Sequence, residues 1–214
     1  AGDYDARRMY QRPKTRLPRQ KKDDLVVTFY PEGGHLIEGV ENRVAFEVTD
    51  QHGEAINITG VLTASGHEPI DIKTDYMGRG SFLVTPDDKR LSTTFRWHDK
   101  DWTTKLPKAE EQGVALRLND GRLTIAAANL PADKAYAVSI LCRGALKHFE
   151  RLALTASQSA QLTIDLPLEQ LPSGVADVTL FDSDGQILAD RLFFVNHHEH
   201  DEALITAPII ANKT

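Results

Sequence analysis

The residues best suited to bind a metal lie near the end of the printed sequence. His197, His198 and His200 stand in a polar run with Glu199 and Asp201. Imidazole and carboxylate groups bind zinc or copper, and His198 and His200 would share a face in an extended chain. Structural zinc sites, however, take their ligands from separate elements, and contiguous polar residues at a domain exit usually face water. The pattern therefore favours a solvated linker, and a weak metal site at the three histidines is the alternative.

A second cluster surrounds the only two tryptophans of the chain, Trp97 and Trp102. Arg96 and His98 flank the first ring, and the run Phe95–Trp102 is typical of a hairpin. Two exposed aromatic rings beside cationic groups would suit stacking on a sugar or a peptide. Large aromatic side chains are more often buried, so cross-strand packing is the favoured interpretation. Ligand binding by Trp97, Trp102, Arg96 and His98 is kept as the alternative.

The sequence offers no recognisable reaction centre. It contains no nucleophile elbow, zinc-protease helix motif, P-loop or dinucleotide-binding glycine motif. The single cysteine, Cys142, ends the apolar run Tyr136–Cys142, which favours a buried small hydrophobic residue over a nucleophile. We therefore expect no catalytic residue, no cofactor and no enzymatic activity.

Charge is distributed unevenly along the chain. Residues 1–24 hold eight basic and four acidic side chains, although the whole chain has a net charge of −6 from 25 basic and 31 acidic groups. Removing this leader leaves 17 basic and 27 acidic groups, a net of −10. This part of the chain is acidic enough to repel the phosphates of a nucleic acid. We therefore expect no nucleic-acid partner. Two prolines and little apolar periodicity predict that the leader is an extended basic linker.

Apolar and polar residues alternate from residue 25 onward, which predicts an all-β fold. In the run 43–49, Val44, Phe46 and Val48 would face a core while their neighbours face outward. Glycine-containing turns separate such runs at short intervals. We expect strands near 25–30, 43–49, 56–64, 69–74, 80–85, 91–97 and 102–106. A second set is expected near 114–118, 122–127, 135–142, 145–154, 160–166, 174–181 and 186–195.

Seven strands on each side of residue 108 predict two tandem immunoglobulin-like β-sandwich domains. Residues 25–108 would form the first domain and residues 109–196 the second. Residues 197–214 would be a polar linker that leads into the apolar stretch 203–211, which either begins a following segment or docks back. Only residues 168–171 suggest a helix, and Pro167 and Pro172 limit it to about one turn. No apolar run is long enough for a membrane helix, so we expect no direct membrane insertion.

Two stretches are similar to a known family. The first is residues 29–46, which contain Phe-Tyr-Pro-Glu-Gly-Gly-His-Leu-Ile-Glu-Gly-Val. The second begins with Leu-Pro-Ser-Gly-Val at 171–175 and continues through 180–185 to Ala-Asp-Arg-Leu-Phe-Phe-Val-Asn at 189–196. Together they resemble the paired macroglobulin-like β-sandwich region of large exported Bacteroidetes envelope proteins, many of which resemble relatives of α2-macroglobulin in their N-terminal part. Some of these carry a TonB-dependent receptor plug domain.

The resemblance implies a fold and a compartment but no functional residue. It implies export to the cell envelope, in the periplasm or at the outer-membrane surface. The partners would be other domains of the same parent protein or other envelope proteins. The macroglobulin thioester needs a Cys-Gly-Glu-Gln type motif, whereas Cys142 is followed by Arg-Gly-Ala, so the thioester is absent.

The two stretches also have architectural interpretations. The turn at 31–34 would let one strand end and the next start in the neighbouring sheet. Asp190 and Arg191 would pair, or Arg191 would reach a backbone carbonyl, before Leu192, Phe193 and Val195 refill the core. The leading hypothesis is a non-catalytic spacer or docking module of a larger envelope protein, and the resemblance adds an association with TonB-dependent transport. The alternative is a glycan- or peptide-binding module that uses the tryptophan hairpin or an open sheet edge.

Overall fold

The computed structural model describes residues 24–64, 68–87, 90–154 and 159–199. Within these ranges the chain forms strands joined by turns, with one short 3-10 helix, η2 (Leu168–Gln170), and no α-helix. The strands are β1 (Leu25–Pro31), β2 (Asn42–Asp50), β3 (Thr59–Ala64), β4 (Ile70–Lys73), β5 (Arg79–Val84), β6 (Leu91–Trp97), β7 (Lys100–Lys105), β8 (Gly113–Asn119), β9 (Arg122–Ala128), β10 (Tyr136–Cys142), β11 (Ala145–Leu152), β12 (Ser159–Asp165), β13 (Gly174–Asp182) and β14 (Ile187–Val195).

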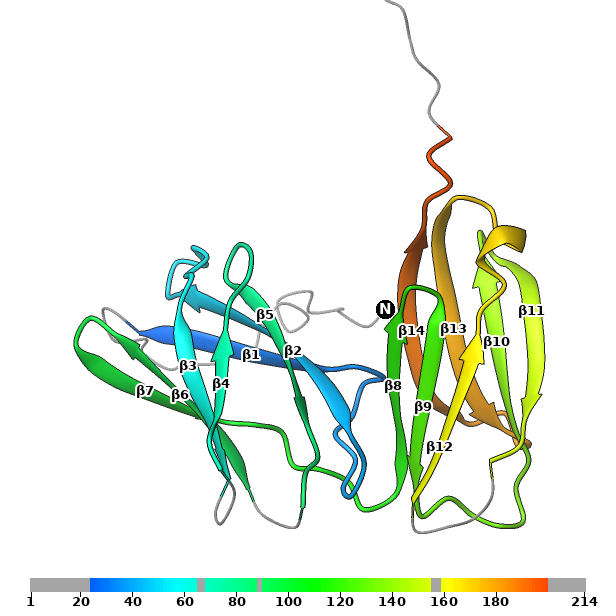
Figure 1. The fold of residues 1–214 in the computed structure, drawn as a ribbon, viewed down its shortest axis with the longest axis horizontal. Helices are drawn as coiled ribbons and strands as arrows, with labels where there is room; N and C mark the ends of the chain where they lie inside the picture. Colours follow the sequence, from blue (N-terminus) through cyan, green and yellow to red (C-terminus); the bar gives the residue numbers. More distant parts are fainter. Residues whose placement is uncertain (1–23, 65–67, 88–89, 155–158, 200–214) are drawn as a thin grey trace, which may run out of the picture.

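Strands β1–β7 form the first sandwich, here termed domain 1, and β8–β14 form the second, domain 2 (Figure 1). In domain 1 a three-stranded sheet of order β1-β2-β5 faces a four-stranded sheet of order β4-β3-β6-β7. In domain 2 the sheet β12-β9-β8 faces the sheet β11-β10-β13-β14. Every strand pair within these sheets is antiparallel, as expected for sandwiches with one buried face per sheet.

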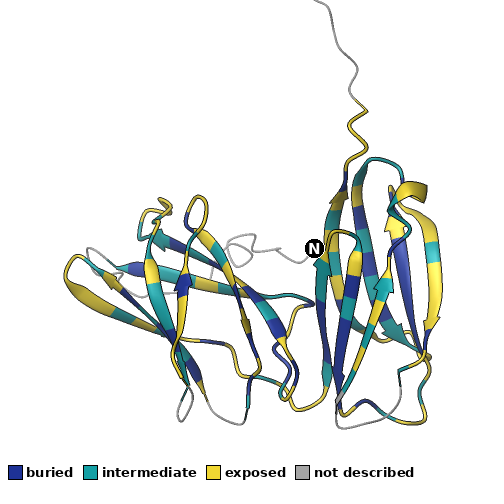
Figure 2. Cartoon of the chain, viewed as in Figure 1, coloured by how far each residue is buried: buried dark blue, intermediate teal, exposed yellow. Residues whose placement is uncertain are grey.

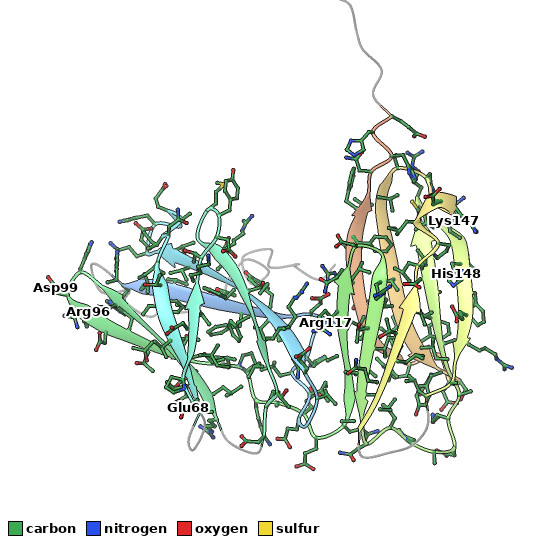
Figure 3. The ribbon with its side chains drawn as sticks, viewed as in Figure 1. Glu68, Arg96, Asp99, Arg117, Lys147 and His148 are labelled. Carbon is green, nitrogen blue, oxygen red and sulfur yellow. The ribbon has the colours of Figure 1, made fainter. Side chains whose placement is uncertain are left out.

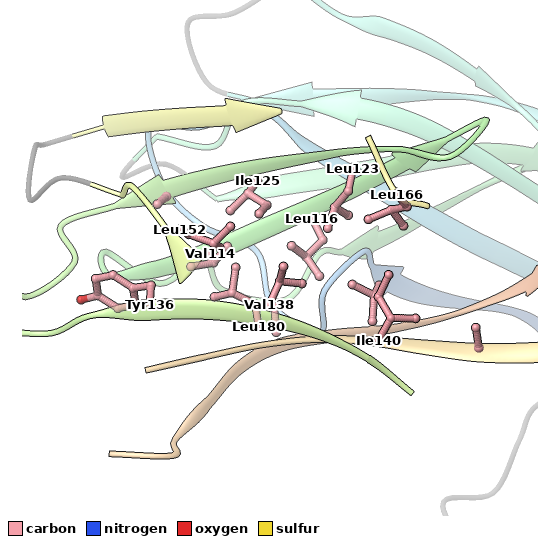
Figure 4. Packing of buried hydrophobic residues seen from close by; sticks show 14 of the residues in the cluster. Val114, Leu116, Leu123, Ile125, Tyr136, Val138, Ile140, Leu152, Leu166 and Leu180 are labelled. Atoms are coloured by element: carbon pink, nitrogen blue, oxygen red, sulfur yellow. The ribbon is translucent and has the colours of Figure 1, made fainter. Parts of the chain in front are cut away.

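Each domain has its own apolar core, built from the inward residues of both sheets. In domain 1 the ring of Phe46 lies 5.8 Å from those of Phe82 and Phe95, so one aromatic group joins the two sheets. In domain 2 the facing layers are fully buried (Figure 4); they include Leu116, Leu123, Ile125, Val138, Ile140, Val178 and Leu180. Burying each such side chain contributes roughly 1.5–3 kcal/mol before entropic costs, which makes these layers the main source of stability.

The all-β prediction is confirmed, and so is the alternation on which it rests. Val44, Phe46 and Val48 are each at most 1% exposed. The single expected helical turn is η2. The predicted division after residue 108 falls between β7 and β8, although the domain limits themselves stay a prediction.

Two architectural expectations are wrong. The segment 31–34 does not send the chain into the neighbouring sheet, because β1 pairs with β2 in the same sheet along the whole length of β1. Leu192 does not refill the core: it is 64% exposed, whereas Val195 is 4% exposed. Successive strand residues face opposite sides, so Leu192 and Phe193 cannot both point inward.

No helix in the described part of the chain is long and apolar enough to cross a membrane.

Candidate functional site

The most elaborate polar arrangement in the structure joins the two domains. Residues 32–41, here termed the interdomain loop, connect β1 to β2 and lie against domain 2 (Figure 1). The loop meets domain 2 where β8 and β14, the edge strands of its two sheets, come into contact. Main-chain contact begins at Glu32, whose carbonyl accepts a 3.3 Å hydrogen bond from the N–H of Leu116 on β8.

Gly33 allows this close approach. Its φ of +97° lies in a region that side-chain-bearing residues rarely adopt. A Cβ atom at this position would lie 3.2 Å from the Leu116 nitrogen and 3.4 Å from the Ala189 Cβ atom. Glycine is therefore required both by the backbone conformation and by the neighbouring strands of domain 2.

The carboxylate of Glu32 is the centre of the contact. Its side chain is only 9% exposed and forms ion pairs with Arg191 of β14 and with Arg43 of β2, the latter at 3.8 Å. Its Oε1 atom also accepts a 2.7 Å hydrogen bond from the N–H of Leu118 on β8. Burial lowers the pKa of Arg191 from its ordinary value. Glu32 thus ties two domains together with charge-assisted contacts in a poorly hydrated place.

Polar pairs flank this centre on the β8 side. Arg43 donates a 2.7 Å hydrogen bond from Nη1 to Oδ1 of Asn119. Arg117 forms an ion pair with Glu41 of the interdomain loop, and Figure 3 shows Arg117 on the side of domain 2 that faces domain 1. Each pair crosses from one domain to the other, so together they fix the direction in which the two sandwiches meet.

An apolar contact lies beside the charged one. Ile37 and Val40 of the interdomain loop form a buried cluster with Ala115, Ala126 and Ala128, which lie on the outer face of β8 and β9. Because the alanine side chains are small, this face is flat, and Ile37 and Val40 can pack against it. The contact buries consecutive residues of β8 and β9, which Figure 2 shows as long dark segments. These parts of β8 and β9 are therefore covered on both faces.

Asn42, the first residue of β2, fixes the conformation of the interdomain loop by hydrogen bonds. It is 1% exposed, and its Oδ1 atom accepts a 2.9 Å hydrogen bond from the N–H of Ile37. Its amide nitrogen donates to the carbonyls of Ile37, at 2.9 Å, and Val40, at 2.8 Å. One buried amide thus presents both apolar residues to domain 2, and its own polar atoms are satisfied.

The connection between β7 and β8 completes the contact. The N–H of Glu110 donates to the carbonyl of Leu36 at 2.8 Å, and its carbonyl accepts from the N–H of Glu38 at 2.9 Å. The carboxylate of Glu110 lies 3.0 Å from Nδ1 of His35. Because the interdomain loop pairs with this linker as well as with β8 and β14, the two domains are held at three separate elements.

The sequence analysis picked out both segments of this site, the interdomain loop and β14, but it did not predict that they are in contact. The resemblance singled out stretches that contain Glu32 and Arg191, and the architectural interpretation of those stretches paired Arg191 with Asp190 or with a backbone carbonyl. The structure shows Arg191 paired with Glu32 instead, because Asp190 faces the opposite side of β14. The available signal was an arginine in the row of β14 whose other members, Ala189, Phe193 and Val195, are apolar, since a charge at an inward-facing position needs a buried partner.

The predicted tryptophan site is a tight hairpin in domain 1. His98 and Asp99 both have positive φ, as a two-residue hairpin turn requires. Trp97 and Trp102 lie on the same side of the sheet as the core, are half-buried and pack against it, with ring centroids 6.5 Å apart. Arg96 is exposed on the other side, at the tip marked in Figure 3.

The ring surfaces of this hairpin are partly occupied. His98 stacks on Trp97 at 4.1 Å, and Lys100 Nζ lies 4.1 Å from the Trp102 ring centroid. The geometry is that of cross-strand packing. Ligand binding by Trp97, Trp102, Arg96 and His98 stays a prediction.

The predicted histidine cluster is only partly described. The His197 ring nitrogen Nε2 lies 2.7 Å from the carbonyl oxygen of Leu171, and His198 has a φ of +56°. His200 lies outside the described residues, as does the basic leader up to residue 23. Among the described residues, no group of three or more histidine, cysteine or acidic side chains is placed to hold a metal ion.

Cys142 is confirmed as a buried residue of the domain 2 core. It is 1% exposed, and its Sγ atom lies 3.5 Å from the carbonyl oxygen of Val175 and 3.8 Å from that of Pro172. A thiol enclosed in this way is not presented to a substrate.

Comparison with known proteins gives only distant likenesses. No protein-family model matches the chain, and no curated protein matches it. A DUF3823 family protein from Bacteroides ovatus is 12% identical over 67% of this chain and 94% of its own, with a TM-score of 0.26. Invasin, a bacterial integrin-binding protein, is 16% identical over 80% of this chain, with a TM-score of 0.31. The α2-macroglobulin of E. coli is 9% identical over 83% of this chain, with a TM-score of 0.25.

The chain spans 39% of the invasin chain and 16% of the E. coli α2-macroglobulin chain. At such identities and TM-scores these likenesses carry no inference about activity or partners. The fold is therefore assigned from the four antiparallel sheets of the structure itself: the chain is a tandem β-sandwich protein.

Proposed function

We propose that the chain is a non-catalytic structural and interaction module, in which two β-sandwiches act as one stiff unit within a larger exported protein. The observation that carries the proposal is the interdomain contact centred on Glu32. The polar side chains of this contact pair across the two domains and fix how the domains are arranged. A hinge between independent domains would not need a buried ion pair at its centre.

The resemblance to macroglobulin-like regions of envelope proteins supports the finer part of the proposal. In that setting the module is exported to the cell envelope and spaces or docks other domains of its parent protein. Its partners are those domains or neighbouring envelope proteins, including components of a TonB-dependent transport system. No nucleic-acid partner is proposed, because the body of the chain is strongly acidic.

Distance measurements between spin labels test the stiffness directly. Labels are attached to Lys73→Cys on β4 and Lys147→Cys on β11, both exposed positions in different domains. The native Cys142 is buried and does not compete for the reagent. We expect one narrow distance distribution, because the domains form a single body. The combined change Glu32→Gln and Arg191→Met should broaden it. A broad distribution in the otherwise unchanged chain would overturn the proposal.

A further inference from the structure

Strand β1 is an end strand of the sheet β1-β2-β5 in domain 1 (Figure 1). It pairs with β2 along all seven of its residues, and no other described strand pairs with its second edge. In each sandwich two edge strands are in contact across the sheets, β4 with β5 and β8 with β14. The other edge strands are β1, β7, β11 and β12. These are the strands whose backbone groups are placed to pair with another chain.

The composition of β1 differs from that of every other edge strand in the described part of the chain. Its sequence, Leu-Val-Val-Thr-Phe-Tyr-Pro, contains no charged side chain. Each of the other strands that end a sheet contains at least one; they are β4, β5, β7, β8, β11, β12 and β14. Charged residues on an edge strand oppose pairing with another chain. The edge of β1 lacks this protection.

Hydrogen bonding to β2 determines which backbone groups of β1 point outward. One position beyond the last β1–β2 pair, the N–H of Glu32 donates to the carbonyl of Arg43 at 2.8 Å. Hydrogen-bonded and non-hydrogen-bonded pairs alternate along an antiparallel ladder. The N–H and carbonyl groups of Leu25, Val27 and Phe29 therefore point away from β2, towards the open edge.

Two further observations agree with this direction. Val48, the register partner of Val27, donates its N–H to the carbonyl of Gly78, just before β5, at 2.7 Å. Pro31 occupies the next outward-facing position of β1 and has no N–H, which is a common place for proline in an edge strand. The open edge of β1 thus offers alternating donors and acceptors and ends in an acceptor alone.

The side chains at this edge are incompletely covered. Phe46 and Val48 of β2 are at most 1% exposed. Their register partners on β1, Phe29 and Val27, lie on the same core-facing side but are only half-buried. On the other side of the sheet Tyr30 is 51% exposed. One more strand beside β1 would extend the apolar layer over Val27 and Phe29.

A second copy of β1 matches this edge. Antiparallel pairing about a two-fold axis at Thr28 sets Val27 opposite Phe29 of the second copy and Leu25 opposite Pro31. The N–H groups of Leu25, Val27 and Phe29 then donate to carbonyl groups that also point outward, those of Pro31, Phe29 and Val27. The facing side chains are uncharged, so the pairing brings no like charges together within the strand.

The ends of the paired strands are compatible with this arrangement. Asp24 of one copy comes opposite Glu32 of the other, one position beyond the strand at each end. The carboxylate of Glu32 already forms ion pairs with Arg43 and Arg191 and is 9% exposed. The negative charge of Glu32 is therefore largely neutralised before a second copy approaches.

Pairing of β1 with itself also has an advantage over pairing with a different edge. It is isologous, so both open edges are used and the assembly stops at two copies. Pairing of β1 with β7, β11 or β12 of another copy would be heterologous and would leave a free edge at each end, which leads to open filaments. It would also place the charged residues of those strands beside the apolar side chains of β1.

The length of β1 limits the strength of such a contact. One pair of seven-residue strands buries less surface than the roughly 1,200–2,000 Å² of a standard stable interface. A weak and reversible dimer is therefore expected, with a dissociation constant of roughly 10–1,000 µM.

We propose that β1 pairs with β1 of a second copy of this chain, so that the β1-β2-β5 sheets of two copies form one continuous antiparallel sheet. The inference is independent of the proposed stiffness of the module, because the edge of β1 lies outside the interdomain contact.

A cross-link at the two-fold axis tests both the surface and the register. Thr28 is exposed, and in this pairing it faces Thr28 of the second copy with their Cα atoms about 4.5 Å apart. That separation suits a disulfide, so the intact chain with Thr28→Cys should form a covalent dimer on mild oxidation. The native Cys142 is buried and does not react. Thr103→Cys, at an exposed position of β7, is the matched control and should stay largely monomeric.

Sedimentation of the intact chain from about 10 µM to about 1 mM gives the complementary test, since this range spans the expected dissociation constant. Thr28→Lys sets like charges opposite each other at the axis and should weaken the dimer at least about tenfold. Thr103→Lys adds the same charge to β7 and should leave the dissociation constant unchanged. A chain that is monomeric throughout this range would overturn the proposal. So would equal cross-linking by the two cysteine variants, or equal weakening by the two lysine variants, in folded protein.

Discussion

Removing the charge of Glu32 should weaken the contact between the domains without disturbing either core. The change Glu32→Gln keeps the shape of the side chain and leaves an oxygen that can still accept the hydrogen bond from Leu118. It removes the negative charge that Arg43 and Arg191 share. Arg191 is then left half-buried without its ionic partner.

The magnitude follows from the exposure of the three side chains. Glu32 is 9% exposed, whereas Arg43 and Arg191 are 28% and 30% exposed. Breaking a fully buried pair costs about 3–5 kcal/mol, and an exposed pair is worth about 0–1 kcal/mol. Because the exposure of this ion pair lies between those two limits, Glu32→Gln should lower the free energy of unfolding by about 2 kcal/mol. For a chain of this size that corresponds to a Tm lower by about 4–8 °C.

Two optical signals separate the domains during unfolding. Both tryptophans of the chain lie in domain 1, so their fluorescence reports that domain alone, whereas far-ultraviolet circular dichroism reports both. The two transitions should coincide in the unchanged chain and separate in Glu32→Gln, because the domains no longer unfold together. A double-mutant cycle with Arg191→Met should give a coupling energy of about 1–2 kcal/mol.

An ion pair within domain 1 provides the control. Glu47 and Arg79 lie 2.9 Å apart, with Arg79 70% exposed, so Glu47→Gln should cost no more than about 1 kcal/mol. If Glu32→Gln destabilises the chain no more than Glu47→Gln does, and its two transitions still coincide, the Glu32 contact does not hold the two domains together.

Three further outcomes are expected. Gly33→Ala should lower stability by about 1–3 kcal/mol in thermal unfolding, because φ is +97° and a Cβ would lie 3.2 Å from the nitrogen of Leu116; an unchanged Tm would contradict this. Asp177→Asn should raise the Tm at pH 7 but not near pH 3, because a raised pKa means that the folded state disfavours the ionised form. Asp182 has a lowered pKa, chiefly through the backbone N–H of Gln186, so its stabilising contribution is present above its ordinary pKa of 3.8 and disappears as the pH falls through the lowered value. Urea midpoints measured between pH 2 and 6 should accordingly fall less steeply on the acid side for Asp182→Asn than for the unchanged chain.

Local pattern was sufficient to predict the strands. The run 91–97 was expected as a strand and is β6 (Leu91–Trp97), and most other expected strands end within one or two residues of the observed ones. The reason is that each sheet has one buried face, so period-two alternation persists along most strands. The alternation also shows why Leu192 was misplaced. Counting back from buried Val195 puts Phe193 and Arg191 inward and Leu192 outward.

The interdomain contact could not be predicted in the same way. Glu32 and Arg191 lie at opposite ends of the chain, and no local period relates them. The sequence of β9 contains one indication that its outer face is covered. Residues Ala126, Ala127 and Ala128 interrupt the alternation, and all three are buried because Ile37 and Val40 cover the face that a lone sheet would expose to water. Only a three-dimensional arrangement shows what covers it.

We propose that the two sandwiches form one rigid body held by the Glu32 contact. Residual dipolar couplings of backbone N–H groups, measured separately for β1–β7 and β8–β14 in weakly aligned protein, test it most directly. One alignment tensor, of the same magnitude and orientation, is expected for both domains. Two different tensors, or a much weaker alignment of one domain, would show that the domains move independently.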